Sequence, residues 1–173
     1  HILKIDYGSI QERLLQLKIK HPNISDVAKI ICQIRSEKLP DPKEIGNSGS
    51  FFKNPIITNK HLKELKLNFQ DIPYYKLSEI KYKIPAAWLI EKAGFKGKRI
   101  KDYGVHEKQA LVIVNYGKAT GAEIFDLSAK ILQSVKNKFD SDPIKIELNR
   151  EDINLVKEYL DIKFPVEEYL TNQ

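Results

Sequence analysis

Residues 46–55, which read Gly-Asn-Ser-Gly-Ser-Phe-Phe-Lys-Asn-Pro, constrain the fold more than any other part of the chain. Two glycines and an asparagine permit positive φ angles and close backbone approaches that other residues resist. The serine, lysine and amide that follow exceed what a plain turn requires. Such a loop can hold an anionic substrate against backbone N–H groups while presenting the Ser50 hydroxyl to the reacting atoms. The alternative is a structural loop that buries Phe51 and Phe52.

The composition indicates a soluble globular protein. The 173 residues suffice for one domain, or for one domain with an appendage, and 42% of them are hydrophobic while 30% are charged. No apolar run approaches the roughly 20 residues that cross a membrane, and no secretory signal pattern opens the chain. We therefore expect a cytoplasmic location and no membrane partner.

Cysteine and methionine usage adds two expectations. The single cysteine, Cys32, lies in an apolar helical stretch, which excludes disulfides and predicts a buried structural thiol in a reducing compartment. The chain begins at His1 and contains no methionine, so we expect a piece of a longer protein.

The net charge of +6 fits an anionic partner, although solvated lysine faces explain the same value. Lysine and arginine are dense only over residues 96–101, which form either a phosphate-contacting turn or an exposed loop. That cluster, near Tyr103, would be the footprint of a nucleic-acid-binding domain. Because no stacking-sheet motif or basic arm accompanies it, we do not expect nucleic acid as a partner.

Hydrophobic periodicity and end signals predict an α+β fold with a small mixed sheet and packed helices. The predicted strands cover residues 2–7, 110–115 and 144–148, and the predicted helices cover residues 10–19, 23 or 25 to 38, 60–67, 85–93, 120–138 and 151–160. In the first helix Leu14, Leu15 and Leu17 are expected to face inward. The strand over 110–115 is nearly all apolar and is expected to be covered on both faces. Thr120 and Glu123 form a capping box at the start of the longest helix.

Several kinds of chemistry lack their signatures. The sequence has no Gly-x-Gly-x-x-Gly fingerprint and no Walker loop, and no cysteine or histidine pair has metal-ligand spacing. A Gly-x-Ser-x-Gly elbow is also missing. We therefore expect no bound metal, and any chemistry of Ser50 differs from that of a hydrolase nucleophile.

The order and spacing of five segments resemble the UDP-N-acetylenolpyruvoylglucosamine reductase family, flavoenzymes of bacterial peptidoglycan precursor synthesis. These segments are Tyr7-Gly8 and residues 35–42, 46–55, 84–94 and 105–111. The resemblance runs from about Leu3 to Phe139 and implies the fold of the family's C-terminal domain. It divides the chain into residues 1–22, the end of a flavin-lobe-like segment, residues 23–148, a substrate-binding domain, and residues 149–173, a helix and tail.

The resemblance also implies cofactors and partners. In the family FAD sits in the N-terminal half, and a hydride passes from NADPH to FAD and then to the enolpyruvyl ether of UDP-N-acetylglucosamine, which gives UDP-N-acetylmuramate. The matched region lacks the flavin lobes. This chain by itself is therefore expected to be inactive and not to hold FAD tightly, and its partners are the UDP-sugar substrate and an N-terminal flavin-binding half.

Residue roles follow from the same resemblance. Ser50 matches the serine that protonates the carbon next to the one that receives the hydride. The positions of substrate contacts are Tyr7, Lys38, Asn54, Tyr75, Lys83 and Gln109. Tyrosine and lysine suit a diphosphate, and amides suit the nucleotide-sugar groups. Without the resemblance, Tyr7 and Tyr75 would be interpreted as ordinary half-buried aromatic residues. Lys38 would be interpreted as a cation that interacts favourably with the helix dipole at a helix C-terminus.

Two departures from the family pattern stand out. Position 48 is serine where alanine is usual. The family ends with a leucine–glutamate–proline–glutamate–valine stretch whose second glutamate serves the active site, and residues 146–152 follow it only faintly. Glu151 is the best match for that carboxylate and Glu147 the alternative, while Glu151 also suits the first turn of a last helix. A non-catalytic module that binds a nucleotide sugar or another anion is the alternative function.

Overall fold

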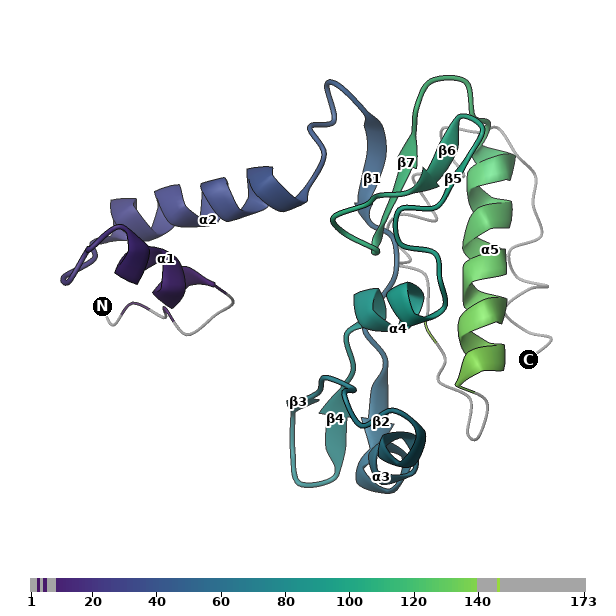
Figure 1. Ribbon diagram of the computed structural model, residues 1–173, viewed down its shortest axis with the longest axis horizontal. Helices are drawn as coiled ribbons and strands as arrows, with labels where there is room; N and C mark the ends of the chain where they lie inside the picture. The colour runs from purple at the N-terminus through teal and green to yellow at the C-terminus, as the bar shows by residue number, and fades with distance from the viewer. Residues whose placement is uncertain (1–2, 4, 6–8, 140–145, 147–173) are drawn as a thin grey trace. The chain divides into compact units, whose positions relative to one another are not determined.

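The structure is a computed structural model, and it describes residues 3, 5, 9–139 and 146 of the chain (Figure 1). The chain divides into two compact units, His1–Glu44 and Ile45–Gln173. This division falls later in the chain than residue 22, where the resemblance placed the first functional boundary.

The first unit is a pair of helices, α1 (Ile10–Gln16) and α2 (Ile24–Lys38). They pack through Ile10, Leu14 and Ile30. Asn23 caps α2, because its side chain accepts a hydrogen bond from the Asp26 N–H at 3.0 Å and the Asp26 carboxylate accepts one from the Asn23 N–H at 3.0 Å. This reciprocal capping box satisfies two N–H groups that the helix itself leaves unpaired. The predicted second helix is thus confirmed.

Three buried positions predicted for this unit are wrong. Leu15 is 78% exposed and Leu17 is 52% exposed, because α1 ends at Gln16 and only one stripe of so short a helix faces α2. Cys32 is exposed as well. It lies two positions beyond Ile30, which is buried, and two positions turn a helix by about 200°, to the opposite side.

The second unit contains a four-stranded antiparallel sheet backed by a long helix. The strands are β1 (Gly46–Ser50), β5 (Arg99–Ile100), β6 (Tyr103–Val105) and β7 (Val112–Asn115), in the order β1-β7-β6-β5. Helix α5 (Gly121–Lys138) packs along the sheet with Leu127, Ile131 and Val135 buried (Figure 1). Residues 112–114 are fully or almost fully buried, which confirms a strand covered on both faces. The capping box of Thr120 and Glu123 is also confirmed.

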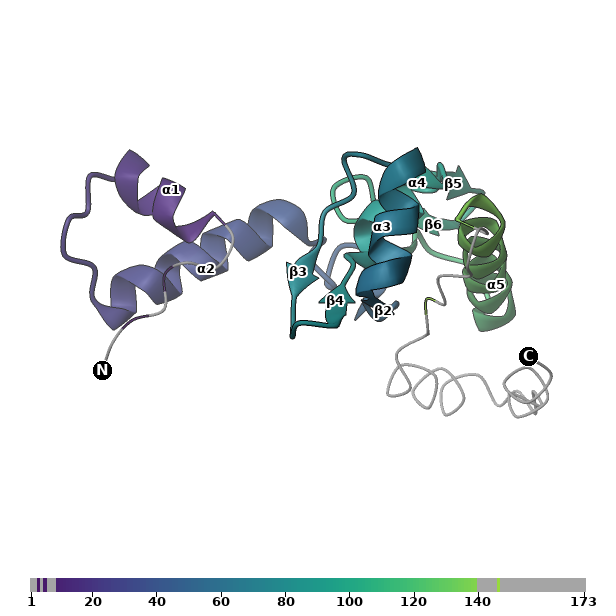
Figure 2. The same cartoon turned by 90° about the horizontal axis from the view of Figure 1, so that it is seen from below.

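A smaller sheet of three antiparallel strands lies in the same unit. It contains β2 (Ile56–Thr58), β3 (Tyr75–Lys76) and β4 (Lys81–Lys83), in the order β2-β4-β3. Helix α3 (Asn59–Asn68) contacts β2 and β4, and Figure 2 shows it lying across them. The short helix α4 (Ala86–Lys92) follows β4 and contacts α5. Both helices match the predicted segments 60–67 and 85–93.

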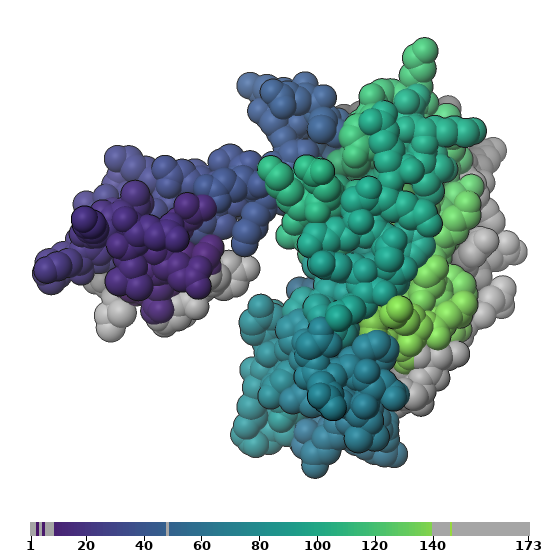
Figure 3. Space-filling view, viewed as in Figure 1, coloured from purple at the N-terminus to yellow at the C-terminus, as the bar shows by residue number. Residues whose placement is uncertain are grey.

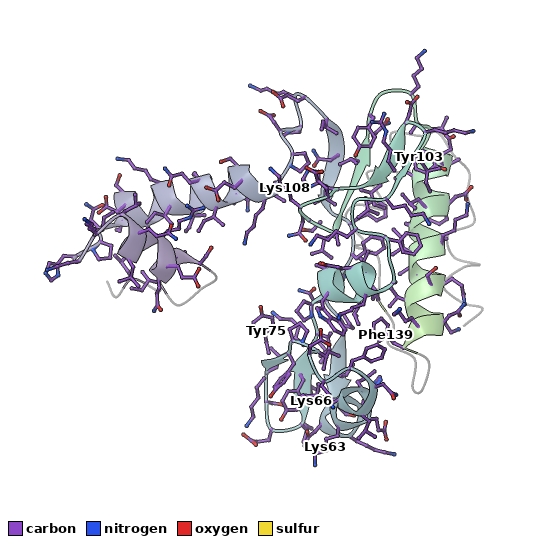
Figure 4. All side chains as sticks on the ribbon, in the orientation of Figure 1. Lys63, Lys66, Tyr75, Tyr103, Lys108 and Phe139 are labelled. Carbon is purple, nitrogen blue, oxygen red and sulfur yellow. The ribbon has the colours of Figure 1, made fainter. Side chains whose placement is uncertain are left out.

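One apolar core joins the two sheets of this unit. Its most deeply buried side chains come from the segment after β1 and from α3, α4, β7 and α5: Phe51, Leu65, Leu89, Ile90, Ile113, Leu127 and Ile131. Phe69, Trp88 and Phe139 extend the core at the end of α5, with ring centroids 4.7–6.1 Å apart. Figure 4 labels Phe139 of this group. The two sheets are therefore fixed to one another by packing, which matters for the site below.

The α+β class is confirmed, but the sheet is not a single mixed one. Every strand pair that the structure describes is antiparallel, and the strands form two sheets. The predicted strand over 144–148 lies outside the described residues except for Ile146, which is in no strand, and the predicted helix over 151–160 lies wholly outside them. The predicted strand over 2–7 lies largely outside as well, and its two described members, Leu3 and Ile5, are not in a strand.

Candidate functional site

The glycine-rich part of residues 46–55 is strand β1, an edge strand with a bulge rather than a free loop. Asn47 lies opposite Val114, and Ser50 lies opposite Val112, so three steps along β1 match two steps along β7. The one extra residue is a β-bulge, a feature that bends a strand and changes where its side chains point. Gly49 has φ +72°, which a glycine adopts without strain. The glycines thus serve an irregular strand, not a flexible nest.

Ser50 is exposed at the end of β1, whereas the two phenylalanines after it are buried. Phe51 is 1% exposed and Phe52 is 3% exposed, and their rings pack edge to face with centroids 5.5 Å apart. The Phe51 N–H also donates to the Leu111 carbonyl oxygen at 2.9 Å. The burial of the two phenylalanines is therefore confirmed, and the serine before them is exposed.

Gln109 belongs to the turn that leads into β7, close in the chain to the partner of Ser50. Its backbone carbonyl accepts a hydrogen bond from the Val112 N–H at 3.0 Å, and Val112 is the residue opposite Ser50. Figure 4 labels Lys108, the exposed cation just before it. The turn therefore brings an amide and a cation toward the end of β1 that carries the hydroxyl.

His106 begins the same turn and was singled out in the sequence only as an isolated histidine. Its Nδ1 accepts a hydrogen bond from the Lys108 N–H at 3.3 Å. Burial lowers the pKa of His106 below its ordinary value, and the Lys108 charge acts in the same direction, against the opposite effect of Glu107. The ring is therefore a neutral, structural acceptor near neutral pH.

Asn54 lies between β1 and β2 in the chain and is bonded to the start of α4. Its Oδ1 accepts a hydrogen bond from the Ala86 N–H at 2.8 Å, which caps the start of α4, and the neighbouring Pro55 carbonyl accepts one from the Ile84 N–H at 3.0 Å. These bonds fix the orientation of the exposed carboxamide. Its Nδ2 donors are the part of the side chain that this capping bond leaves for a ligand.

Tyr75 and Lys83 are directly opposite one another on β3 and β4. The Lys83 Nζ lies 5.5 Å from the centroid of the Tyr75 ring, and Tyr75 is 59% exposed (Figure 4). Ile56, opposite Lys83 on the other side of β4, is 58% exposed. A cation beside an accessible ring and apolar surface suits a ligand that joins an anionic group to a planar one.

The structure thus brings five of the predicted residues into one unit, in two groups. Ser50 and Gln109 lie at the four-stranded sheet, and Asn54, Tyr75 and Lys83 lie at the three-stranded sheet, with residues 51–55 running between them. The space-filling view shows the surface indented between these two parts (Figure 3).

The other four predicted site residues are not among these five. Lys38 is exposed at the last position of α2, in the other compact unit. Tyr7, Glu147 and Glu151 lie outside the described residues.

Asn47 is a residue whose role sequence reasoning missed. Its Nδ2 donates to the Ile45 carbonyl oxygen at 3.0 Å, and its Oδ1 accepts from the Gly49 N–H at 3.1 Å. An asparagine two residues before a glycine is the signal that could have indicated this, because asparagine side chains often bond the backbone two residues on.

The basic cluster over residues 96–101 is engaged largely with its own surroundings. Lys96 pairs with Glu91 at 2.9 Å, the Lys98 Nζ lies 4.9 Å from the Phe95 ring centroid, and the Arg99 guanidinium lies 4.0 Å from the Tyr116 centroid. These contacts account for much of the cluster as a structural turn.

Capping side chains occupy the N-termini of three of the helices, which leaves these three poorly suited to a flavin diphosphate. Such a group favours a helix N-terminus with unused N–H groups, yet α2 and α5 carry capping boxes that place carboxylates there, and the Thr58 hydroxyl caps α3. Hydrogen bonds from Thr120 lower the pKa of Glu123, which keeps that group anionic. Within residues 3, 5, 9–139 and 146, no group of three potential ligands could hold a metal ion, and no helix has the length and apolarity to span a membrane.

Comparison with known proteins extends the resemblance. A family model described as the C-terminal domain of UDP-N-acetylenolpyruvoylglucosamine reductase matches residues 41–151. The reductase of Flavobacterium johnsoniae is 48% identical over 147 residues, which cover 85% of this chain and 43% of that protein. The enzyme of Pseudomonas fluorescens is 44% identical over 86% of this chain and 43% of its own length.

A third relative, the reductase of Pseudomonas aeruginosa, is 44% identical over 79% of this chain and 40% of its own length. The chain therefore spans about two fifths of the length of the curated relatives it matches. The family model covers more than half of the chain, and the match includes β1, both sheets and α5. The chain belongs to the UDP-N-acetylenolpyruvoylglucosamine reductase family, and residues 41–151 correspond to its C-terminal domain.

Proposed function

We propose that this chain is the substrate-binding part of a flavin-dependent reductase. The reaction reduces the enolpyruvyl ether of UDP-N-acetylglucosamine to UDP-N-acetylmuramate, a step of peptidoglycan precursor synthesis. FAD, reduced by NADPH, supplies the hydride when bound to an N-terminal flavin-binding half of the complete enzyme. The names of the relatives support this division of labour, as does the share of their length that this chain spans, 43% in the first two.

The observation that carries the proposal is the placement of Ser50. Its hydroxyl is exposed at the end of a strand, while the adjacent Phe51 and Phe52 are held in the core. A hydroxyl fixed in this way can approach a substrate without losing its position, which is what a proton donor in catalysis requires. A serine whose side chain faced the packed interior would have argued against this role.

The chemistry assigned to Ser50 is a single proton transfer. Reduction of the carbon–carbon double bond leaves enolate character on the carbon next to the one that receives the hydride. The Ser50 O–H bond breaks as a C–H bond forms at that carbon, and the serine oxygen then regains a proton from solvent. A hydroxyl is a poor acid at rest, but it can protonate so basic a carbon when held beside it.

The other residues are assigned to substrate binding. Lys83 and Tyr75 suit the diphosphate, because the lysine brings a positive charge and the tyrosine a hydroxyl donor. Asn54 and Gln109 suit the sugar, since amides both donate and accept. The resemblance alone adds Tyr7 and Lys38 as contacts and Glu151, or Glu147 in its place, as the active-site carboxylate.

The test replaces Ser50 by alanine in the complete reductase, in which this chain is accompanied by its flavin-binding half. Loss of the proton donor should lower turnover by roughly 10²- to 10⁴-fold. Binding of the UDP-sugar substrate, measured by calorimetry, should stay almost unchanged. Ser36→Ala, at an exposed position of α2, is the matched control and should leave both quantities unaltered.

Wild-type turnover in the Ser50→Ala enzyme would overturn the assignment of the proton donor. Binding of UDP sugars by a complete protein that shows no turnover even with Ser50 in place would favour the alternative, a non-catalytic nucleotide-sugar-binding module. Affinity measurements with Asn54→Ala would then identify whether the same surface is used.

A further inference from the structure

We propose that Asn47 is a positioning residue, which holds the bulge of β1 and thereby determines on which face of the sheet the Ser50 hydroxyl lies. The inference rests on the proposed function, because it matters for catalysis only if Ser50 donates the proton. It adds a residue that touches neither substrate nor cofactor in that proposal.

The register between β1 and β7 fixes the face of the sheet on which each side chain lies. Directly opposite residues of an antiparallel pair point to the same face of a sheet, and successive residues alternate. Asn47 is opposite Val114, and Ser50 is opposite Val112, so both share the face of these two valines. In a regular strand, residues three positions apart point to opposite faces. The extra residue of the bulge therefore reverses the face on which Ser50 lies.

The face opposite to that of Asn47 and Ser50 faces the apolar core. Ile113, between the two valines, belongs to the core that includes Leu127 and Ile131 of α5. Phe51 belongs to the same core and is 1% exposed. The face of Val112 and Val114 is also buried at β7, but Ser50 is exposed at the end of the edge strand β1. With the bulge in place, Phe51 enters the core that contains Ile113, and Ser50 lies on the other face. Without the bulge, the alternation would direct the serine toward the core face and the phenylalanine away from it.

The bulge is held by two hydrogen bonds of the Asn47 side chain. The Asn47 side chain connects residues on both sides of itself: Nδ2 donates to the Ile45 carbonyl oxygen at 3.0 Å, and Oδ1 accepts from the Gly49 N–H at 3.1 Å. Gly49 takes the left-handed conformation, φ +72°, that the irregular strand needs. The half-buried Asn47 is thus the side chain that connects the start of β1 to the residue immediately before Ser50.

The consequence for catalysis is specific. Proton transfer to carbon depends on the placement of the donor, and a displacement of about 1 Å can lower a rate by about 10²-fold. The residues assigned to substrate binding lie on other segments, with Asn54 fixed by its bond to Ala86 and Lys83 located in β4. Removing the Asn47 bonds should therefore lower turnover and leave substrate affinity largely intact.

The experiment compares Asn47→Ala and Asn47→Asp in the complete reductase. Asn47→Ala should lower kcat by about 10- to 100-fold with KM within about twofold of wild type. Aspartate keeps an oxygen for the Gly49 N–H, so Asn47→Asp should recover most of kcat. Asn68→Ala, at the exposed last position of α3, is the matched control and should behave as wild type.

Hydrogen exchange at the Gly49 amide tests the bulge without reference to catalysis. We expect faster exchange in Asn47→Ala and restored protection in Asn47→Asp, in variants whose circular dichroism shows an intact fold. Unchanged kcat together with unchanged Gly49 exchange in Asn47→Ala would overturn the inference, and so would a large rise in KM without a fall in kcat. If Ser50→Ala itself leaves turnover intact, the proposed function fails, while the exchange result still decides whether Asn47 holds the bulge.

Discussion

The two sheets of the second unit differ in how their faces are covered. In the four-stranded sheet the central strand β7 is enclosed on both sides, with Val112, Ile113 and Val114 at most 2% exposed. In the three-stranded sheet α3 contacts β2 and β4, but Ile56 and Tyr75 remain more than half exposed. One sheet has a fully enclosed central strand, and the other presents apolar and aromatic side chains to solvent.

This difference matches what each sheet is proposed to do. A proton donor must be placed accurately, and Ser50 extends from a strand paired with the enclosed β7. Binding a UDP sugar requires accessible charge and ring surface, and Tyr75 and Lys83 lie on the less enclosed sheet. In the proposed division, stability is concentrated in one part of the unit and ligand affinity in another.

The largest expected effect is a loss of unfolding free energy when a large core side chain beside the four-stranded sheet is removed. Phe51→Ala removes a side chain that is 1% exposed, and such changes typically cost about 3–5 kcal/mol of unfolding free energy. Tyr75→Ala, on the open sheet, should change that free energy by only about 0.5 kcal/mol. Chemical denaturation of both variants measures the contrast, and equal losses would contradict the division drawn above.

Gly104→Ala in β6 should cause a smaller loss of unfolding free energy. A Cβ there would meet the Lys98 carbonyl oxygen and lie 2.9 Å from the Arg99 Cα, so the backbone of β5 would have to move. Overpacking of this kind costs about 1–3 kcal/mol. Gly46→Ala on β1 is the matched control, because its Cβ would lie 3.4 Å from the Asn115 carbonyl oxygen. The denaturation midpoint of Gly104→Ala should therefore fall further than that of Gly46→Ala.

Substitutions in the three-stranded sheet should weaken ligand binding and leave the unfolding free energy almost unchanged. Lys83→Ala removes the cation beside Tyr75 and should weaken UDP-sugar binding by roughly 1 kcal/mol, while leaving the melting temperature almost unchanged. Calorimetric titration measures the affinity. Lys63→Ala, on α3 (Figure 4), is the control and should not alter binding. An unchanged affinity for Lys83→Ala would remove this lysine from the proposed site.

The smallest expected effect is a dependence on acid at the helix that backs the enclosed sheet. Hydrogen bonds from the Thr120 backbone and hydroxyl lower the pKa of Glu123 in the folded chain. The stabilisation is therefore fully present above the ordinary glutamate pKa and is lost as the pH falls through the lowered folded-state pKa. Thermal unfolding followed from neutral to acidic pH should show a shallower decline for Glu123→Gln than for wild type.

Much of the fold was predictable because its signals are local. The capping box of Thr120 and Glu123 lies within the first turn of α5 and is confirmed, and Asn23, one of the two predicted starts of the second helix, is the cap of α2. The continuous apolar run of β7 likewise predicted a strand covered on both faces. These features depend on residues close together in the chain, so no knowledge of distant partners was needed.

Other features escaped prediction because they depend on distant partners. An apolar stretch around Cys32 suggested burial, but the short α1 covers only one side of α2, and the thiol is exposed. The same limited cover leaves Leu15 and Leu17 in solvent. The sequence could not distinguish two antiparallel sheets from one mixed sheet, because the pairing of two strands depends on both of them.

The sequence by itself determined the helices and their caps, the buried strand β7, and the residue types gathered around Ser50, because local bonding and periodicity fix these. Only the tertiary structure decided the face on which Ser50 lies. That face follows from the register between β1 and β7, which lie about sixty residues apart, and from a core that accepts Phe51 on one side of the sheet. A shift of one residue exchanges the two faces of a strand, so the placement of the hydroxyl is a property of the pairing and not of the segment alone.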